Sequence, residues 1–433
     1  MQTPLRISFL DHTAKLGGAE LSLLNTLEKL DRSRFTPFVI LGEDGPLAHK
    51  LTAAGVDTYI VPLESEVADA KKDQLGARSL LKVHTVWKTL TYSWRVARLM
   101  RSKKVDLIHA NSLKADIIGG LCAWFTGLPL IWHIHDRLEG DYLPRPVAAT
   151  IRHLCRWLPD FVVANSQSTL HSLRLPNRDR SAVIFEGIPP APNTASTPAS
   201  ANSFALVPAH ANLSTGVSTS APPDESGVFE RTDLDVASEE PVVVGIVGRL
   251  TPWKGQHVLI EAAALVRGHF PSATFQIIGS AMFGENSYEA SLKRRVVELG
   301  LGDCVEFLGF REDVGSLVDR LDVLVHASIL EEPFGRVITE GMLGGKPVVA
   351  TRGGGVPEIV VDGITGLLVS MSDVGNMAEA ICTLLADPVL RKQMGKEGRK
   401  RASEYFTTDQ TVPQLESVFE RIGAAHRKRF VVD

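Results

Sequence analysis

The sequence predicts an α/β fold made of two doubly wound, Rossmann-like parallel sheets that face each other across a cleft. Short, continuously apolar runs alternate with longer helical patterns in both halves of the 433-residue chain, which is typical of parallel strands covered on both faces. A single stretch of different composition separates the two halves, and the length allows two or three domains. In such sheets, ligands bind outside the carboxyl ends of the strands.

The first domain is expected over residues 1–189, and helical patterns separate its strands. Each strand is a short run rich in Val, Ile, Leu and Phe, as expected of a buried parallel strand. We expect strands at residues 5–10, 36–41, 57–62, 105–110, 128–135, 160–165 and 181–186.

Residues 190–240 are rich in Ala, Ser, Thr and Pro and lack periodicity, which predicts a linker or insertion that buries little apolar surface. The second domain is expected over residues 241–433, with helical patterns from about residue 373 and a last helix that returns to the first domain. Its strands are expected at residues 241–250, 273–280, 304–310, 321–328, 346–351 and 365–370.

The composition excludes several classes of protein. Apolar residues make up 44% of the chain and charged residues 22%, with a net charge of -4, so there is no overall attraction to nucleic acid. The four cysteines match no zinc or redox spacing and are expected to be buried reduced thiols. The first apolar run is too short for a signal peptide, and no run reaches the ~20 apolar residues of a membrane span. These features predict a cytoplasmic protein.

The segment "GRLTPWKG" at 248–255 follows a predicted strand and precedes a helical pattern. Arg249 and Lys254 therefore lie on a strand-to-helix loop, where two cations suit a diphosphate. The alternative is a pair of solvated surface cations. A second glycine loop, "KLGGAE" at 15–20, places Gly17 and Gly18 before a helix, as in an anion site. A tight turn explains the same glycines equally well.

Polar residues also end the strand at 128–135. His135 and Asp136 are expected to face the cleft, whereas His133 is expected to be a hydrogen-bonded residue inside the sheet. No third ligand with recognisable spacing accompanies the histidines, so no metal site is predicted.

The segment "EEPFGRVITE" at 331–340 brackets an expected helix start with two glutamates. Pro333 suits a first helical position and Gly335 a close backbone approach. Glu332 would then lie before the helix and Glu340 about a turn and a half inside it. The helix N-terminus would receive a phosphate, and the glutamates would reach hydroxyls on its two sides, as in a nucleotide sugar. Two surface glutamates around a helix cap are the alternative.

The segment "TRGGGVPE" at 351–358 adds a triple-glycine loop that allows a close backbone approach. Together with this loop, the motifs above are similar to those of the retaining glycosyltransferases of family 4, in order and position over residues 5–189 and 241–425. The resemblance implies a GT-B fold and transfer of a sugar from a nucleotide-diphosphate donor, with retention, no cofactor and no obligatory metal. A UDP- or GDP-sugar is the expected donor, and a lipid-linked, polysaccharide or other cell-envelope molecule the expected acceptor.

The resemblance also implies roles for individual residues. Arg249 and Lys254 would stabilise the leaving diphosphate, and Glu332 and His135 would meet the donor sugar near the reacting centre. The ribose would bind Glu340. The donor would also contact the following four residues: Gly17 and Gly18 at the phosphates, and Phe334 and Gly335 through their amides. Two positions depart from the family pattern, since Gly341 and Glu186 stand where alanine and asparagine are more usual.

Residues 71–104 hold ten Lys or Arg and one acid, with Val83, Trp87, Leu90 and Trp94 at helical spacing. This pattern fits a helix that contacts an anionic membrane surface, on the inner face of the membrane. The alternative is an ordinary helix with its apolar face toward the sheet. Two other functions stay open: a GT-B sugar-nucleotide epimerase and a non-catalytic nucleotide-sugar-binding protein. A Rossmann oxidoreductase is disfavoured because the G-x-G-x-x-G fingerprint is absent.

Overall fold

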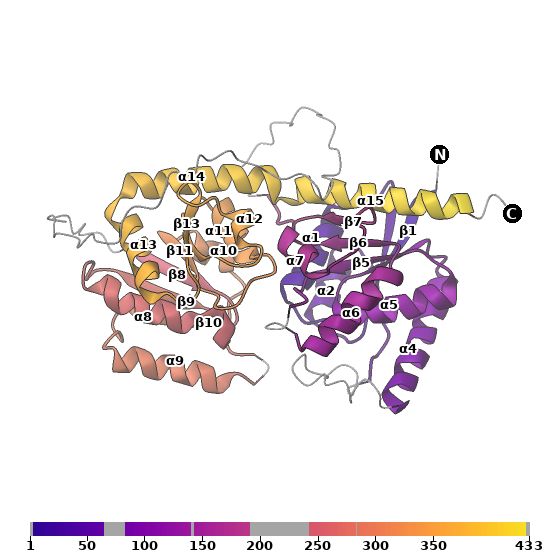
Figure 1. Ribbon diagram of the computed structural model, residues 1–433, viewed down its shortest axis with the longest axis horizontal. Helices are drawn as coiled ribbons and strands as arrows, with labels where there is room; N and C mark the ends of the chain where they lie inside the picture. Colours follow the sequence, from indigo (N-terminus) through magenta and orange to yellow (C-terminus); the bar gives the residue numbers. More distant parts are fainter. Residues whose placement is uncertain (1–2, 65–82, 140–142, 191–241, 283, 430–433) are drawn as a thin grey trace.

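Two parallel β-sheets, each covered by helices on both faces, form the framework of the protein (Figure 1). The structure, a computed structural model, describes residues 3–64, 83–139, 143–190, 242–282 and 284–429. The strand order is β3-β2-β1-β4-β5-β6-β7 in the first sheet and β10-β9-β8-β11-β12-β13 in the second. All the strand pairs of these sheets are parallel. The predicted α/β class is confirmed, and the predicted linker at 190–240 lies almost wholly outside the described residues.

The first sheet is built from residues 5–183, and every strand overlaps a predicted one. Its strands are β1 (Leu5–Asp11), β2 (Phe35–Leu41), β3 (Asp57–Ile60), β4 (Leu107–Ala110), β5 (Leu130–Ile134), β6 (Phe161–Ala164) and β7 (Ser181–Val183). Its helices are α1 (Gly18–Lys29), α2 (Pro46–Ala53), α4 (Val83–Ser102), α5 (Leu113–Thr126), α6 (Arg145–Trp157) and α7 (Gln167–Ser172).

The second sheet is built from residues 243–369, again at the predicted positions. Its strands are β8 (Val243–Val247), β9 (Thr274–Ile278), β10 (Val305–Gly309), β11 (Val323–His326), β12 (Val348–Thr351) and β13 (Gly366–Val369). The helices are η2 (Pro252–Lys254), α8 (Gln256–Arg267), α9 (Asn286–Glu298), α10 (Val314–Val318), α11 (Arg336–Leu343), α12 (Val356–Ile359), α13 (Val374–Ala386), α14 (Pro388–Tyr405) and α15 (Thr408–Arg429).

The strand order reverses at one place in each sheet. In the first sheet β1 lies between β2 and β4, and in the second β8 lies between β9 and β11. Loops on either side of such a reversal leave the sheet in opposite directions, so a crevice opens at the carboxyl ends of the two strands. The loops after β1, β8 and β11 carry most of the predicted site residues.

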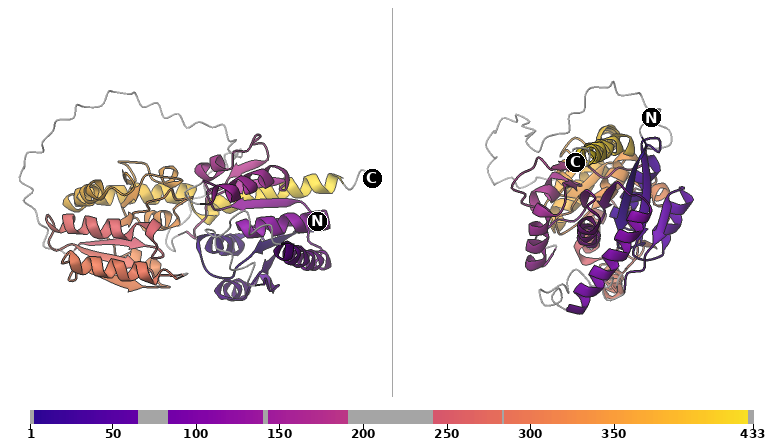
Figure 2. Two further views of the ribbon diagram at one scale, coloured as in Figure 1. Left: turned by 60° about the horizontal axis from the view of Figure 1, so that its bottom comes forward. Right: turned by 90° about the vertical axis from the view of Figure 1, so that its right-hand side faces the viewer.

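The last helix, α15, packs against the first sheet although it follows the second sheet in the chain. Figures 1 and 2 show it continuing from α14 across to β1 and α1. The Phe419 ring lies edge-on to those of Phe9 and Phe35, with ring centroids 5.8 and 5.9 Å apart. The segment between α14 and α15 is hydrogen-bonded to Ile188, near the end of the first domain. The Ile188 N–H donates to the Phe406 carbonyl at 3.0 Å, and the Thr408 N–H donates to the Ile188 carbonyl at 2.9 Å.

The structure corrects two expectations, one about the burial of the cysteines and one about the direction of the tryptophans on α4. Cys122, Cys155 and Cys304 are buried free thiols, but Cys382 is only half-buried. On α4, Trp87 is 66% exposed and Trp94 is 51% exposed. α4 does turn an apolar face toward the sheet, as the alternative expects, but Trp87 and Trp94 are not part of that face. Tyr92, Val96, Ala97 and Met100 make up the buried face of this helix instead.

The contact of α15 with the first sheet yields a stability prediction. Phe419→Ala leaves a cavity beside Phe9 and Phe35, so we expect the free energy of unfolding to fall by about 3–5 kcal/mol. The measurement is urea unfolding followed by circular dichroism. The control is Val389→Ala, an exposed position on the neighbouring α14, for which we expect a change within about 0.5 kcal/mol. A similar, small loss for both variants would contradict the packing.

Candidate functional site

The predicted site residues gather at the carboxyl ends of strands in the two sheets. Gly17 and Gly18 stand at the start of α1, and His135 directly follows β5. Arg249 and Lys254 lie between β8 and α8, and the 331–335 segment lies between β11 and α11. Parallel strands end at one edge of a sheet, so each domain presents its share of these residues at one edge.

The structure pairs Lys254 with Glu332 directly. Lys254 Nζ donates to both carboxylate oxygens, at 2.9 and 2.8 Å, and Glu332 is buried. Ser328 Oγ donates to Glu332 Oε2 at 3.0 Å, and His326 Nε2 lies 3.4 Å from the same oxygen. Burial raises the pKa of Glu332, but Lys254 and His326 outweigh it and hold this pKa well below its usual range. The carboxylate is therefore ionised and is surrounded by donors.

The start of α11 differs from the expected one. The helix begins at Arg336, and its N-cap is Gly335 with φ +117°, which favours glycine. Pro333 lies in the preceding loop, so the prediction that it occupies the first helical position is wrong. Glu340 is the fifth residue of the helix, about one turn after its first residue rather than the predicted turn and a half inside it, and it accepts a hydrogen bond from Arg336 Nε at 2.8 Å. Burial raises the pKa of Glu340 and Arg336 compensates only in part.

The triple-glycine loop packs against the 331–335 segment. The Gly355 N–H donates to the Glu332 carbonyl at 2.8 Å. Gly354 has φ +61°, and a Cβ there would lie 1.9 Å from the Glu332 carbonyl oxygen. The close approach predicted for these glycines is therefore an approach to the Glu332 backbone itself.

The N-terminus of α1 holds a carboxyl group of its own chain. A Cβ at Gly17 would stand 2.6 Å from Glu20 Oε2, whereas a Cβ at Gly18 would meet no atom within 4 Å. Burial and the neighbouring Asp11 raise the pKa of Glu20 to about 8. The Glu20 carboxyl therefore lies at the start of α1, beside Gly17.

His135 is engaged by two partners of its own domain. Its Nδ1 lies 3.2 Å from Glu186 Oε1, and its Nε2 lies 3.1 Å from Asn111 Oδ1. The His133 ring stacks on it with centroids 4.2 Å apart. His133 is buried in the sheet as predicted, but the prediction that it is fully hydrogen-bonded is wrong, since its Nε2 has no partner among the described residues. Burial and the nearby His135 hold the pKa of His133 well below its usual range.

The 331–335 segment also contacts the first domain. Ser166 Oγ donates to the Pro333 carbonyl at 2.6 Å, and Arg137 forms an ion pair with Glu331. Beside them, Glu358 accepts hydrogen bonds from the backbone N–H groups of Gln167 and Ser168, both at 2.8 Å. The loop that carries Glu332 is therefore held by both domains. The Phe334 side chain is buried there and stacks on Phe185, with centroids 5.9 Å apart.

Several residues of these networks were not predicted: Asp11, Asn111, Ser166, His326, Ser328 and Arg336. Most of them share one signal, a polar residue at or just after the end of an apolar strand, as in "LVHAS" and "LIHAN". The partners of Asp11, Asn111 and Ser166 lie far along the chain and could not be identified from spacing. Arg336, in contrast, stands four residues before Glu340 on α11, a spacing typical of a helical ion pair.

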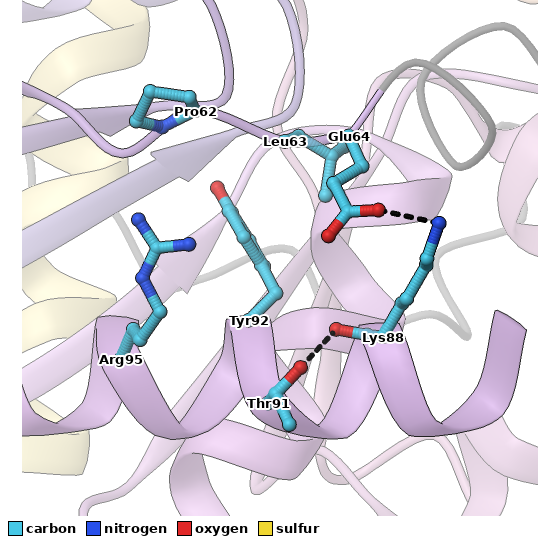
Figure 3. A pocket seen from close by; sticks show the side chains of 7 residues that line it. All are labelled: Pro62, Leu63, Glu64, Lys88, Thr91, Tyr92 and Arg95. Atoms are coloured by element: carbon cyan, nitrogen blue, oxygen red, sulfur yellow. Dashed lines mark hydrogen bonds and ion pairs between the residues drawn. The ribbon is translucent and has the colours of Figure 1, made fainter. Parts of the chain in front are cut away.

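A separate hollow lies on the first domain, between the segment after β3 and helix α4 (Figure 3). It contains none of the predicted site residues. Lys88 Nζ pairs with Glu64 at 2.6 Å at one end, while Tyr92 and Arg95 project from α4 toward the segment at 62–64. Within the described ranges, no group of three or more His, Cys, Asp or Glu side chains is arranged to hold a metal ion.

The packing of Gly354 yields a prediction with a matched control. Gly363 has φ +74°, similar to that of Gly354, but a Cβ at Gly363 would meet nothing within 4 Å. We expect Gly363→Ala to lower stability by about 1–2 kcal/mol through backbone strain alone. Gly354→Ala adds a collision with the Glu332 backbone, so its thermal midpoint should fall further. Equal shifts in the two variants would show that the contact with Glu332 has no weight.

Comparisons with known proteins agree with this arrangement. Residues 231–401 match the family model described as glycosyl transferases group 1, and residues 16–191 match that of glycosyltransferase family 4. D-inositol 3-phosphate glycosyltransferase of Corynebacterium efficiens is 34% identical over 186 residues, which are 42% of this chain and 43% of that protein. The lipopolysaccharide core biosynthesis glycosyltransferase LpsE of Rhizobium meliloti is 32% identical over 180 residues, 42% of this chain and 50% of LpsE. The chain thus spans about half the length of the curated relatives it matches.

Solved structures resemble the whole chain. HepE of Anabaena, solved with UDP and glucose, is 26% identical with a TM-score of 0.73, and the match covers 96% of this chain and 99% of HepE. Sucrose-phosphate synthase of Thermosynechococcus elongatus, at 20% identity and a TM-score of 0.68 over 97% of this chain and 100% of that one, shares the fold. The fold is GT-B, and the chain belongs to the group 1 glycosyl transferases, glycosyltransferase family 4.

Proposed function

We propose that the protein is a retaining glycosyltransferase that moves a sugar from a nucleotide-diphosphate donor to a cell-envelope acceptor, without an obligatory metal. In this reaction the bond from the anomeric carbon to the diphosphate breaks and a bond to the acceptor oxygen forms. The acceptor's proton leaves with the diphosphate. The observation that carries the proposal is the meeting of Lys254, Glu332 and the N-terminus of α11 at the strand ends of the second domain.

Arg249 and Lys254 would neutralise the leaving diphosphate, as Mg²⁺ does in other enzymes. In the described structure Lys254 is held by Glu332. When a donor binds, its diphosphate would replace Glu332 as the anionic partner of Lys254. The Glu332 carboxylate could then accept hydrogen bonds from sugar hydroxyls. The backbone N–H groups at the start of α11 and at Phe334 and Gly335 would add to the phosphate site.

A UDP-sugar is the donor we favour, with a GDP-sugar as the other candidate, because HepE was solved with UDP and glucose and also with UDP-glucose. Glu340 would hold the ribose hydroxyls, and Glu332 and His135 would meet the sugar. Gly18 would let a phosphate approach the start of α1, since the space beside it is open.

The acceptor is proposed to be lipid-linked or a polysaccharide, which the relationship to LpsE supports. The outer face of α4 carries Trp87, Trp94, Arg98 and Arg101, all exposed. Exposed tryptophans beside cations suit an anionic lipid surface, so we propose that this helix rests on the inner face of the membrane. Residues 71–82 of the basic stretch lie outside the described residues, and in the described ones no helix is long and apolar enough to cross a membrane.

Two other functions use the same fold. A GT-B sugar-nucleotide epimerase would turn over a sugar nucleotide without an acceptor, and a binding protein would hold it without turnover. We favour transfer because the five ionisable residues implied by the resemblance are all present. Four of them follow strand ends, namely His135, Arg249, Lys254 and Glu332, and Glu340 lies on α11.

The proposal is tested first by calorimetry with UDP-, GDP- and ADP-sugars. The sugar nucleotide that binds then serves as donor in a turnover assay. We expect Lys254→Ala and Glu340→Ala to lose transfer by about a hundredfold or more, with circular dichroism unchanged. Lys346→Ala is the control, since Lys346 lies just before β12, at the opposite end of the strand from the site, and its Nζ donates to the Asp319 carbonyl at 2.6 Å. Near-normal transfer in both site variants would refute the site, and the absence of binding by any sugar nucleotide would refute the function.

The membrane proposal is tested by liposome flotation. We expect flotation with vesicles of phosphatidylglycerol and not with phosphatidylcholine alone, and a loss when Trp87 and Trp94 are both changed to Ser. Val297→Ser, at a 76% exposed position on α9 of the other domain, should float as the wild type does. Wild-type protein that floats with neither lipid would contradict the membrane contact.

A further inference from the structure

Glu186 stands at the domain junction, where the family pattern leads one to expect asparagine. It is buried, and its Oε1 faces His135 Nδ1 at 3.2 Å while accepting a hydrogen bond from Asn165 Nδ2 at 2.9 Å. Asn165 Nδ2 also donates to the His135 backbone carbonyl, at 3.2 Å. Glu186 therefore contacts the His135 ring directly and is linked to the His135 backbone through Asn165.

The hydrogen bonds of Asn111 to its other partners show which of its side-chain atoms faces His135. Asn111 Nδ2 donates to Asp11 Oδ2 at 2.9 Å and to the Ala19 carbonyl at 3.3 Å. The amide oxygen of Asn111 is therefore the atom that faces His135 Nε2, at 3.1 Å. A carboxylate oxygen and an amide oxygen can only accept. Each ring nitrogen of His135 thus faces an acceptor, and each must carry a hydrogen to make its bond.

We propose that Glu186 is a positioning residue that holds the His135 ring doubly protonated and fixed at the cleft, within the chain Glu186–His135–Asn111–Asp11. The inference deepens the proposed function, on which it rests for the role of His135. With Glu186, the histidine that this family places near the donor sugar would be a cation at neutral pH. It would act on the diphosphate by its charge, since both of its N–H groups are already committed.

The charged groups around His135 support this state. Burial lowers the pKa of His135, but Glu186 first, and then Asp136 and Glu20, raise it above its usual value. Burial raises the pKa of Glu186, and the hydrogen bond and charge of His135 together with Arg336 bring it below its usual value. On the other face of the ring, burial and the His135 charge keep His133 neutral.

His109 lies edge-on to His133, with its ring centroid 5.3 Å from that of His133, and burial lowers its pKa to about 3. Asp11 at the far end of the chain of contacts is also buried, and His12 is the main group that keeps its carboxylate ionised against that burial. Of the three neighbouring histidines, His135 therefore carries the positive charge, because it has acceptors on both nitrogens.

The direct test is nuclear magnetic resonance of ¹⁵N-histidine-labelled protein without any ligand. In wild type we expect both His135 nitrogens to be protonated at pH 7. In Glu186→Gln, which keeps the size of the side chain and removes its charge, the titration midpoint should move to lower pH by about one unit or more. Glu416→Gln is the control, because Glu416 is as buried as Glu186, at 6%, but pairs with Arg34 on α15's side of the first sheet. It should leave the His135 midpoint unchanged.

Turnover gives a second readout. A histidine with a raised pKa supplies its charge below that pKa and loses it as the pH rises through it. The alkaline limb of the kcat profile should therefore move to lower pH in Glu186→Gln by the same shift, and Glu186→Asp should move it less. A wild-type ring protonated on one nitrogen at pH 7, or an unmoved midpoint in Glu186→Gln, overturns the inference. The wild-type spectrum decides even if the variant does not fold. A doubly protonated ring in a protein that transfers no sugar upholds the pairing and overturns only its role in the proposed function.

Discussion

The ion pair between Lys254 and Glu332 is the interaction on which the arrangement of the strand-end loops depends. A buried carboxylate without a cation is costly by several kcal/mol, so the loop after β8 must stay beside the loop after β11. The Ile329 N–H adds to this by donating to the Trp253 carbonyl at 2.8 Å. With the two loops joined, Lys254 of one lies beside the segment that leads into α11 in the other, at the crevice outside the strand ends.

That crevice is closed on its other side by the first domain. The contacts of Ser166 with Pro333 and of Glu358 with the start of α7 place the first sheet's polar strand ends opposite the second's. The packing of α15 against the first sheet also helps to hold the two domains in this arrangement. A change in the angle between the domains would therefore alter the loop that carries Glu332, which links donor binding to domain closure in the proposed enzyme.

Much of the fold and of the site's location could be predicted from the sequence. Apolar runs bounded by turn residues are local signals, so every strand of both sheets lies where a run was found. The same apolar runs predicted the positions of the loops that carry Arg249, Lys254 and Glu332, because these loops follow the strands β8 and β11. The start of α11 did not, because Gly335 adopts a conformation open to glycine and so ends the loop two residues after Pro333. The sequence left open whether Trp87 and Trp94 point outward, as the membrane interpretation requires, or toward the sheet, since α4 has apolar residues on two faces.

The pairings could not be predicted, because they join residues far apart in the chain. Lys254 and Glu332 are separated by 78 positions, and His135 and Glu186 by 51. Spacing within a helix or strand carries no information on such contacts. The sequence analysis expects Lys254, Glu332 and His135 each to contact part of the donor, whereas in the described structure they form hydrogen bonds with other side chains of the chain. A donor that binds Lys254 as proposed would therefore compete with Glu332 for it.

The most direct test of this account is a crystal structure of the protein with a nucleotide-diphosphate sugar. We predict that Lys254 Nζ turns from Glu332 to a phosphate oxygen, that the diphosphate lies at the start of α11, and that Glu332 and Glu340 accept hydrogen bonds from the sugar and the ribose. A donor bound elsewhere, with the Lys254–Glu332 pair intact, would contradict it.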